Sequence, residues 1–210
     1  MGAVSAQDRR YQEFVVDHGS LVVADDGVNL VGFAGVIERA GQALGGVDTV
    51  IVTAARFATQ DTLASDRSLT RQLLSTNFVN TILFCECART QLLARGGGTL
   101  CVFSSVAGDR GRRPVVLYGA AKAGLSAYLE GLDHAYRTAG LVTVCVKPGF
   151  VRTAMTAGLP EPPFAADPDE VARTALKAID RGTPVVYAPP VWALVMLIID
   201  RKSTRLNSSH

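Results

Sequence analysis

The sequence predicts a single α/β domain built around a parallel β-sheet. From Thr49 onward, short runs of β-branched residues alternate with longer runs of helical periodicity, a pattern typical of strand–helix–strand units. The chain has 210 residues, and 48% of them are hydrophobic, which is enough for one sizeable core. Charged residues make up 19% of the sequence, so the chain lacks the charge excess of a disordered protein.

The elements can be placed in order along the chain. Apolar residues at helical spacing predict helices at residues 9–16, 34–43, 71–94, 117–139 and 168–178. Runs rich in β-branched residues predict strands at residues 21–24, 50–52, 99–103, 141–146 and 185–187. Glycines at 96–98 supply a C-cap for the third helix, and Asp167 and Pro168 supply an N-cap and a first-turn proline for the fifth. Pro148 and Gly149 should end the fourth strand, because proline cannot donate a ladder hydrogen bond.

The last eleven residues, 200–210, differ sharply in composition from the apolar stretch before them. They match, residue for residue, the translation of a DNA string that resembles a common sequencing adapter, so we expect the domain to occupy residues 1–199. Arg201, Lys202 and Arg205, less Asp200, carry the whole formal charge of +2 and leave residues 1–199 neutral. The charge balance therefore gives no argument for a nucleic-acid partner.

Cysteine usage and hydropathy predict a cytoplasmic protein. The four cysteines lie in apolar segments without a CxxC pair, and the first residues do not resemble a signal peptide, which favours reduced, buried thiols. The longest apolar run, residues 187–199, is too short to cross a bilayer but could lie against a membrane surface. His18 and His134 have no companions at metal-ligand spacing, so we expect no metal.

A hydroxyl, a phenol and an ammonium recur at a spacing that suits acid catalysis. Ser105 lies thirteen residues before Tyr118, and Lys122 follows the tyrosine by four residues. Positions i and i+4 share one face of a helix, so the lysine cation can reach the surroundings of the phenol. A free phenol, with a pKa of about 10, is a poor acid near neutrality, and an adjacent positive charge lowers that pKa. We therefore expect Lys122 to make Tyr118 a usable proton donor.

The surroundings of these residues resemble the short-chain dehydrogenase/reductase family. The joint pattern is Asn77 within a helix, Ser105 at the end of the next strand, Tyr118 and Lys122 on the following helix, and Pro148-Gly149 after the strand beyond it. Tyr-x-x-x-Lys alone is a weak motif, whereas the joint order is far stronger. The resemblance covers residues 48–187. It implies a Rossmann-type, doubly wound parallel sheet and an NAD- or NADP-dependent oxidoreductase that reduces a ketone to a secondary alcohol.

The resemblance also implies roles for individual residues. Tyr118 would protonate the substrate oxygen, Ser105 would hold that oxygen, and Lys122 would lower the tyrosine pKa and grip the nicotinamide ribose. Asn77 would order a water that relays protons to the lysine. The implied cofactor-binding residues are Ala54, Tyr118, Lys122, Pro148, Gly149, Val151 and Thr153.

Two departures from the family pattern are visible. The glycine-rich loop that holds the dinucleotide phosphates is missing, and the glycines at 96–98 follow a helix instead of opening one. The family's Asn-Asn-Ala-Gly is replaced by Val52-Thr53-Ala54-Ala55, which loses a side-chain amide contact. We therefore expect a domain truncated at its N-terminus, with residues 50–52 exposed at the sheet edge and residues 21–24 either beside them or unpaired. Such a fragment should bind dinucleotide weakly or not at all and be inactive.

Finer features indicate a subgroup and its partners. The arginine-containing segment 104–113 and the segments 151–155 and 187–189 are similar to reductases that act on polyprenylphosphoryl keto-sugars in cell-wall arabinan precursor synthesis. Arg110, Arg112 and Arg113 could hold the phosphate of such a lipid-linked sugar. The alternatives are a general ketoreductase and a non-catalytic Rossmann-like interaction module. Family members also form dimers and tetramers through long helices, for which residues 71–94 and 117–139 are suitable.

Overall fold

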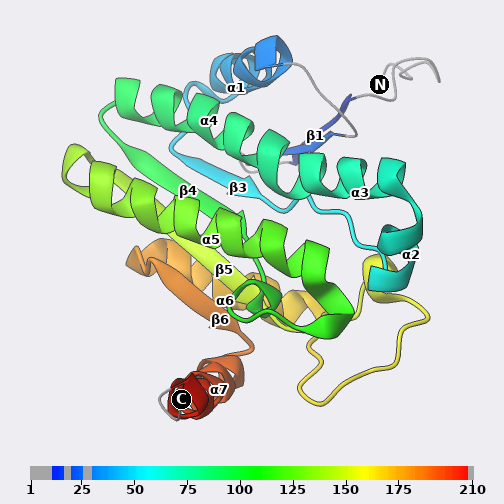
Figure 1. Ribbon diagram of the computed structural model, residues 1–210. Helices are drawn as coiled ribbons and strands as arrows, with labels where there is room; N and C mark the ends of the chain where they lie inside the picture. The colour runs from blue at the N-terminus through cyan, green and yellow to red at the C-terminus, as the bar shows by residue number, and fades with distance from the viewer. Residues whose placement is uncertain (1–10, 17–19, 26–29, 208–210) are drawn as a thin grey trace.

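A four-stranded parallel sheet forms the centre of the domain, with its strands in the order β3-β4-β5-β6 (Figure 1). The computed structural model describes residues 11–16, 20–25 and 30–207, and their side chains over residues 32–199. The strands are β3 (Thr49–Val52), β4 (Gly98–Phe103), β5 (Leu141–Pro148) and β6 (Val185–Ala188). Because every pair in this sheet is parallel, the carboxyl ends of all four strands meet at one edge.

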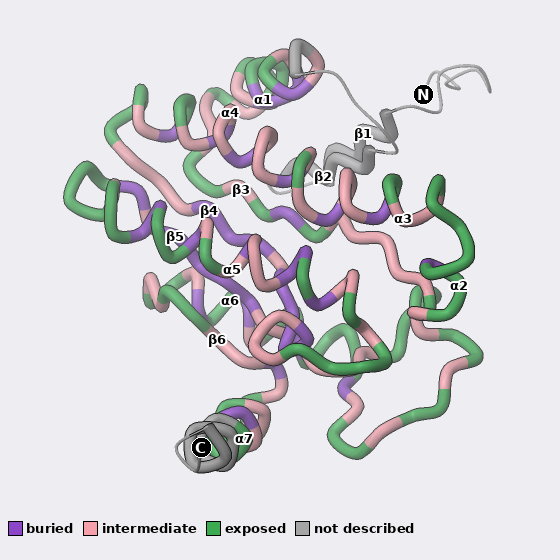
Figure 2. The backbone as a smooth tube through the Cα atoms, viewed as in Figure 1, coloured by how far each residue is buried: buried purple, intermediate pink, exposed green. Residues whose placement is uncertain are grey.

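Helices cover both faces of this sheet. They are α1 (Leu30–Leu44), α2 (Gln60–Ser65), α3 (Arg67–Leu74), α4 (Thr81–Ala94), α5 (Val116–Tyr136), α6 (Pro168–Arg181) and α7 (Val191–Asn207). Leu100 and Cys145 pack with α4 and α5 on one face, while Cys101 and Val146 pack with α6 on the other. Figure 2 shows the buried residues concentrated along β4 and β5, between the two helical layers. The doubly wound arrangement expected from the sequence is therefore confirmed.

The predicted helix at residues 71–94 is interrupted by a wider turn. It consists of α3, a π-helical segment (Ser75–Asn80) and α4. A π-helical turn adds one residue between hydrogen-bonded groups, and such turns are frequent at functional sites. Asn77 lies in this turn and is fully buried.

The end of β5 and the N-cap of α6 differ from the expectation. β5 runs two residues further than predicted, because Pro148 pairs with Ala188 and the next amide, of Gly149, donates to Ala188 O at 3.1 Å. Asp167 does occupy the N-cap position of α6, but its side chain makes no capping hydrogen bond. Its carboxylate instead accepts a hydrogen bond from Arg152 at 3.1 Å.

The segment before α1 forms a separate two-stranded sheet. β1 (Tyr11–Val16) and β2 (Ser20–Asp25) pair in antiparallel register. The prediction of a helix at residues 9–16 was wrong, and Arg9 and Arg10 lie outside the described residues. The apolar spacing of residues 11–16 also suits a strand, and valine and aromatic residues favour strands. The strand expected at 21–24 is confirmed, but it neither joins β3 nor stays unpaired, because a three-residue connection allows local hairpin pairing with β1.

The outer edge of β3 is open among the described residues. β3 pairs with β4 alone, and Ile51 is 45% exposed, as the sequence predicted for this edge.

All four cysteines are free thiols, three of them buried. Within the part of the chain that the structure describes, none of the helices is both long and apolar enough to span a bilayer.

Candidate active site

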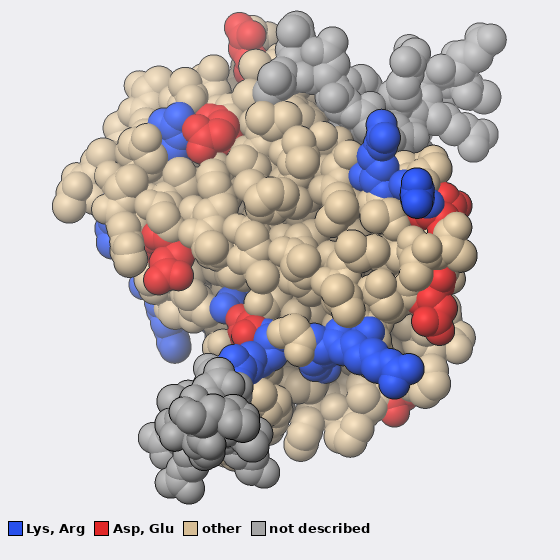
Figure 3. Space-filling model, viewed as in Figure 1, with Lys and Arg blue, Asp and Glu red and all other residues tan. Residues whose placement is uncertain are grey.

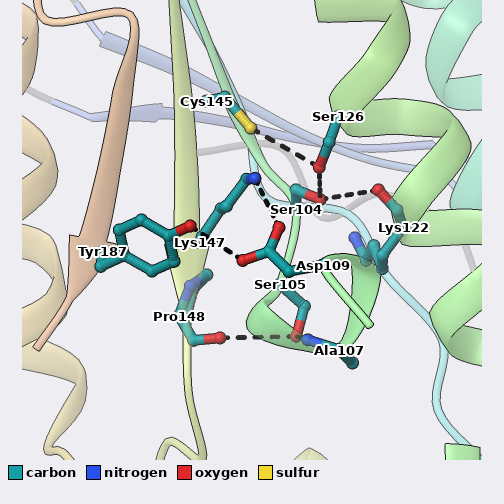
Figure 4. Close-up of polar contacts among 10 residues, drawn as sticks. All are labelled: Ser104, Ser105, Ala107, Asp109, Lys122, Ser126, Cys145, Lys147, Pro148 and Tyr187. Carbon is teal, nitrogen blue, oxygen red and sulfur yellow. Dashed lines mark hydrogen bonds and ion pairs between the residues drawn. The ribbon is translucent and has the colours of Figure 1, made fainter. Parts of the chain in front are cut away.

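Two consecutive serines at the carboxyl end of β4 face different neighbours (Figure 4). Ser104 Oγ donates to Lys122 O at 2.9 Å and shares a 2.7 Å hydrogen bond with Ser126 Oγ, which ties β4 to α5. Ser105 Oγ donates to Pro148 O at 3.4 Å and accepts from the Ala107 amide at 3.1 Å. Ser105 thus caps the 3₁₀ turn Val106–Gly108 and lies between β4 and β5.

Two glycines allow this turn to pack directly on α5. A Cβ at Gly108 would lie 2.7 Å from Lys122 C and Ala123 N, and a Cβ at Gly119 would lie 2.8 Å from Ala107 O. Both distances are too short for a side chain, so the close approach of turn and helix requires glycine at each position. The contact brings Ser105 to the part of α5 that carries Tyr118 and Lys122.

Tyr118 and Lys122 occupy one face of α5, as their spacing predicted. The Lys122 Nζ lies 5.9 Å from the centroid of the Tyr118 ring and donates to Phe103 O at 2.7 Å. Lys122 is only 1% exposed. Tyr118 also contacts Phe57 edge to face, with ring centroids 5.3 Å apart. The structure therefore brings Ser105, Tyr118 and Lys122 together at the carboxyl edge of the sheet.

The electrostatics of this trio differ from the expectation. Burial raises the pKa of Tyr118 above its ordinary value, and the hydrogen bond with Ser105 only partly offsets this effect. Burial also lowers the pKa of Lys122 to about 8, because a desolvated ammonium is disfavoured. The predicted lowering of the tyrosine pKa by the lysine was thus wrong for this structure. The phenol keeps its proton across the neutral range, which is the form that an acid catalyst needs.

Asn77 is connected to the site through the loop that follows β3. Its Oδ1 accepts from the Arg56 amide at 2.7 Å, and its Nδ2 donates to Arg56 O at 2.7 Å. The side chain therefore clamps the backbone next to Phe57, the residue that contacts Tyr118. Each polar atom of its side chain thus has one partner in this clamp, and the water relay expected at Asn77 stays a prediction.

Replacing Asn77 with alanine should destabilise the fold. The change leaves the Arg56 amide and carbonyl without their partners, and we expect a loss of roughly 2–4 kcal/mol in the free energy of unfolding. Urea denaturation would measure it. Asn80→Ala, in the same π-helical segment, is the matched control and should change stability by less than about 0.5 kcal/mol. Equal losses in the two variants would contradict the clamp.

The predicted turn at Pro148 and Gly149 adjoins the trio. Pro148 O accepts from Ser105, and Gly149 lies against the indole of Trp192 on α7. A Cβ at Gly149 would lie 2.0 Å from Trp192 Nε1, so packing of this indole is one reason for the glycine. Trp192 Nε1 is buried without a hydrogen-bond partner among the described residues.

The other predicted cofactor residues lie along the same edge. Ala54 is half-buried in the loop after β3. Val151 forms an isolated parallel bridge with Ala166, and the exposed Thr153 caps the 3₁₀ turn Ala154–Thr156 in a capping box with Thr156. These residues follow the carboxyl ends of β3 and β5, where doubly wound sheets bind ligands.

Sequence reasoning missed a partly buried polar network beside Ser105. Asp109 accepts from Lys147 Nζ at 2.5 Å and from Tyr187 Oη at 2.9 Å. The side chains of Asp109 and Lys147 are only 12% and 13% exposed. The available signal was Lys147 itself, since a cation inside an otherwise apolar buried strand requires an anionic partner.

Comparisons with known proteins found a matching family and several relatives. A family model described as short chain dehydrogenase matches residues 22–163. An uncharacterized oxidoreductase of Mycobacterium tuberculosis is 33% identical over 150 residues, which cover 71% of this chain and 59% of that protein. An uncharacterized oxidoreductase of Streptomyces coelicolor is 34% identical over 162 residues, covering 73% and 61%. The chain thus spans about three-fifths of the length of these relatives.

A solved structure supports the fold. The bulky-bulky ketone specific alcohol dehydrogenase from Comamonas testosteroni superposes with a TM-score of 0.67 at 20% identity, over 86% of this chain and 69% of that one. At this identity the likeness concerns the architecture alone.

Proposed function

Because this chain belongs to the short-chain dehydrogenase family, we propose that it carries the acid half of an NAD- or NADP-dependent oxidoreductase site that reduces a ketone to a secondary alcohol. The observation that supports this most strongly is the convergence of Ser105, Tyr118 and Lys122 at the carboxyl edge of a doubly wound sheet. The relatives named above are oxidoreductases, which agrees with the same class of reaction.

The proposed chemistry uses the protonated phenol. Tyr118 donates its proton to the carbonyl oxygen of the substrate, and Ser105 Oγ, already oriented by the Ala107 amide, hydrogen-bonds the same oxygen. The phenolate left behind accepts a hydrogen bond from the Ser105 hydroxyl, and a protonated Lys122 adds a positive charge to the site. Lys122 must then be protonated, which its pKa of about 8 permits at neutral pH.

A nicotinamide dinucleotide would supply the hydride when bound. The residues present suit its nicotinamide end. Among the described residues, Phe103 O is the hydrogen-bond acceptor of Lys122 Nζ, so an ammonium with three donors can also bind a ribose hydroxyl. Ala54 and Ala55 allow close approach to the backbone after β3. The sequence contains no glycine-rich segment between a strand and a helix for the pyrophosphate, so we propose that residues 1–199 alone bind dinucleotide weakly and are inactive.

Binding and turnover measured on two forms of the protein test this proposal. Calorimetry with NADH and NADPH should give dissociation constants above about 1 mM for residues 1–199. The complete gene product should oxidise one of the two in the presence of ketones of graded size. Sub-millimolar binding by residues 1–199 would contradict the first part, and failure of the complete gene product to reduce any ketone would contradict the second.

We further propose a lipid-linked keto-sugar as substrate, with the decaprenylphosphoryl 2-keto-pentose of arabinan precursor synthesis as the leading candidate. Arg112 and Arg113 are exposed on the loop that joins the Ser105 turn to α5. Figure 3 shows basic side chains gathered in a band below α5. On α7, Leu194 and Leu197 are more than half exposed, which suits contact with an acyl chain or a membrane surface. A general ketoreductase would instead reduce small ketones as well as large ones. The assay with ketones of graded size therefore separates the two substrate classes.

A non-catalytic interaction module remains the alternative from another class. The open edge of β3 and the exposed Ile51 favour it, because an unpaired strand edge can bind another chain.

Self-association through the outer faces of α4 and α5 is a further proposal. Sedimentation of the complete gene product tests it.

A further inference from the structure

We propose that Asp109, Lys147 and Tyr187 form a positioning network that fixes the Ser105 turn for catalysis. This inference deepens the proposed function, since the network acts on the hydroxyl that would hold the substrate oxygen. The three residues come from three segments far apart in the sequence. Asp109 directly follows the 3₁₀ turn, Lys147 lies on β5 and Tyr187 lies on β6. Figure 4 shows the Asp109 carboxylate between the other two side chains.

Each oxygen of the Asp109 carboxylate has its own partner. Lys147 Nζ donates to Oδ1 at 2.5 Å, and Tyr187 Oη donates to Oδ2 at 2.9 Å. Lys147 Nζ also lies 5.7 Å from the centroid of the Tyr187 ring. Hydrogen bonds to charged groups are short and strong, and two of them from different strands hold the carboxylate in a defined orientation. The network therefore fixes the C-terminal end of the turn to the sheet.

The turn is held on its other side by α5. Gly108 packs on the backbone of Lys122 and Ala123 at a distance that excludes any side chain. The residues between Ser105 and Asp109 thus lie between α5 on one side and β5 and β6 on the other. Ser105 itself has weaker restraints, because its hydrogen bond to Pro148 O is 3.4 Å long. Loss of the Asp109 anchor would free the turn to shift, and displacements of about 1 Å in a catalytic site can reduce the rate by about 10²-fold.

Tyr187→Phe is the most selective variant for a test, because it removes the hydrogen bond to Asp109 and leaves the Asp109–Lys147 ion pair intact. The matched control is Tyr128→Phe on α5, which removes a hydrogen bond of the same kind, to Glu86 Oε1 at 2.7 Å, away from the Ser105 turn. Two readouts are compared in the complete gene product. They are amide hydrogen exchange over residues 104–110 and the steady-state kinetics with a ketone that the unaltered protein reduces.

We expect Tyr187→Phe to accelerate exchange in residues 104–110 about tenfold and leave β4 unchanged. It should lower kcat about tenfold or more while the dissociation constant for dinucleotide stays constant. Asp109→Asn should have a larger effect on both exchange and kcat. In the double variant that also carries Lys147→Met, the melting temperature should be restored but kcat should not. Tyr128→Phe should change neither readout.

The two ideas fail in different ways. Exchange in residues 104–110 that is the same for Tyr187→Phe and Tyr128→Phe would overturn the network, whether or not the protein turns over. Faster exchange with an unchanged kcat would show a purely structural role and would also overturn the proposal. Absence of ketone reduction in the unaltered gene product would instead contradict the proposed function. Amide exchange over residues 104–110 would then still show whether the network anchors the Ser105 turn.

Discussion

Replacing Tyr118 with phenylalanine should lower the kcat of ketone reduction about 10³-fold in the complete gene product. The change removes the phenolic proton, and general acid catalysis contributes about 10²–10⁴-fold to such reactions. The phenylalanine ring keeps the edge-to-face contact with Phe57, so the fold and the dinucleotide affinity should be preserved. Steady-state kinetics and calorimetry on the purified variant measure both quantities.

Tyr128→Phe is the control for this variant as well. Tyr128 lies on the same helix, but its hydroxyl donates to Glu86 and not to a group of the proposed site. It should keep kcat within about twofold, because the hydrogen bond that it removes involves no group of the proposed site. Ketone reduction by Tyr118→Phe at the unaltered rate would exclude Tyr118 as the proton donor.

The stability of the domain should rise with pH relative to that of Lys122→Met. The pKa of Lys122 is lowered from 10.5 to about 8, so the unfolded chain binds more protons than the folded one between these values. The penalty for burying the ammonium is therefore present below about pH 8 and disappears as the pH approaches 10.5. The shift corresponds to about 3 kcal/mol.

Urea denaturation of both proteins between pH 7 and pH 10.5 tests this expectation. The difference in unfolding free energy between the unaltered protein and Lys122→Met should change by about 3 kcal/mol in favour of the unaltered protein. Taking this difference cancels the titration of shared groups that do not interact with Lys122, including the buried thiol of Cys101, whose pKa burial raises to about 12. A difference that stays constant with pH would mean that Lys122 titrates normally.

Much of the parallel sheet could be predicted because the local sequence of each strand is typical of a β-strand. Runs of β-branched residues between helical segments marked β3 to β6, and the i, i+4 spacing placed Tyr118 and Lys122 on one face of α5. The segment 9–16 could not be assigned in this way, since its apolar spacing suits a helix and a strand equally. Pairing with β2 decided it, and pairing depends on contacts that periodicity does not contain.

The pKa values of the site residues were harder to predict than the identities of those residues. Charge spacing suggested that Lys122 would lower the pKa of Tyr118, but Lys122 is buried and Tyr118 half-buried, and desolvation is the largest cause of the pKa shift of each. The Asp109 network was missed for a related reason. Its three members are separated by up to 78 positions and come together only when β5 and β6 are adjacent. Sequence therefore identified the groups that converge at the candidate site, whereas burial and tertiary pairing determine their protonation and support.

Deuterium transfer tests the central proposal most directly. The complete gene product is incubated with a reducible ketone and with NADH or NADPH carrying deuterium at the nicotinamide C4, and the alcohol product is analysed by mass spectrometry. We predict one deuterium on the carbinol carbon of the product, and its formation should be about 10³-fold slower with Tyr118→Phe. An alcohol product without deuterium, or equal rates for the two proteins, would contradict the proposal.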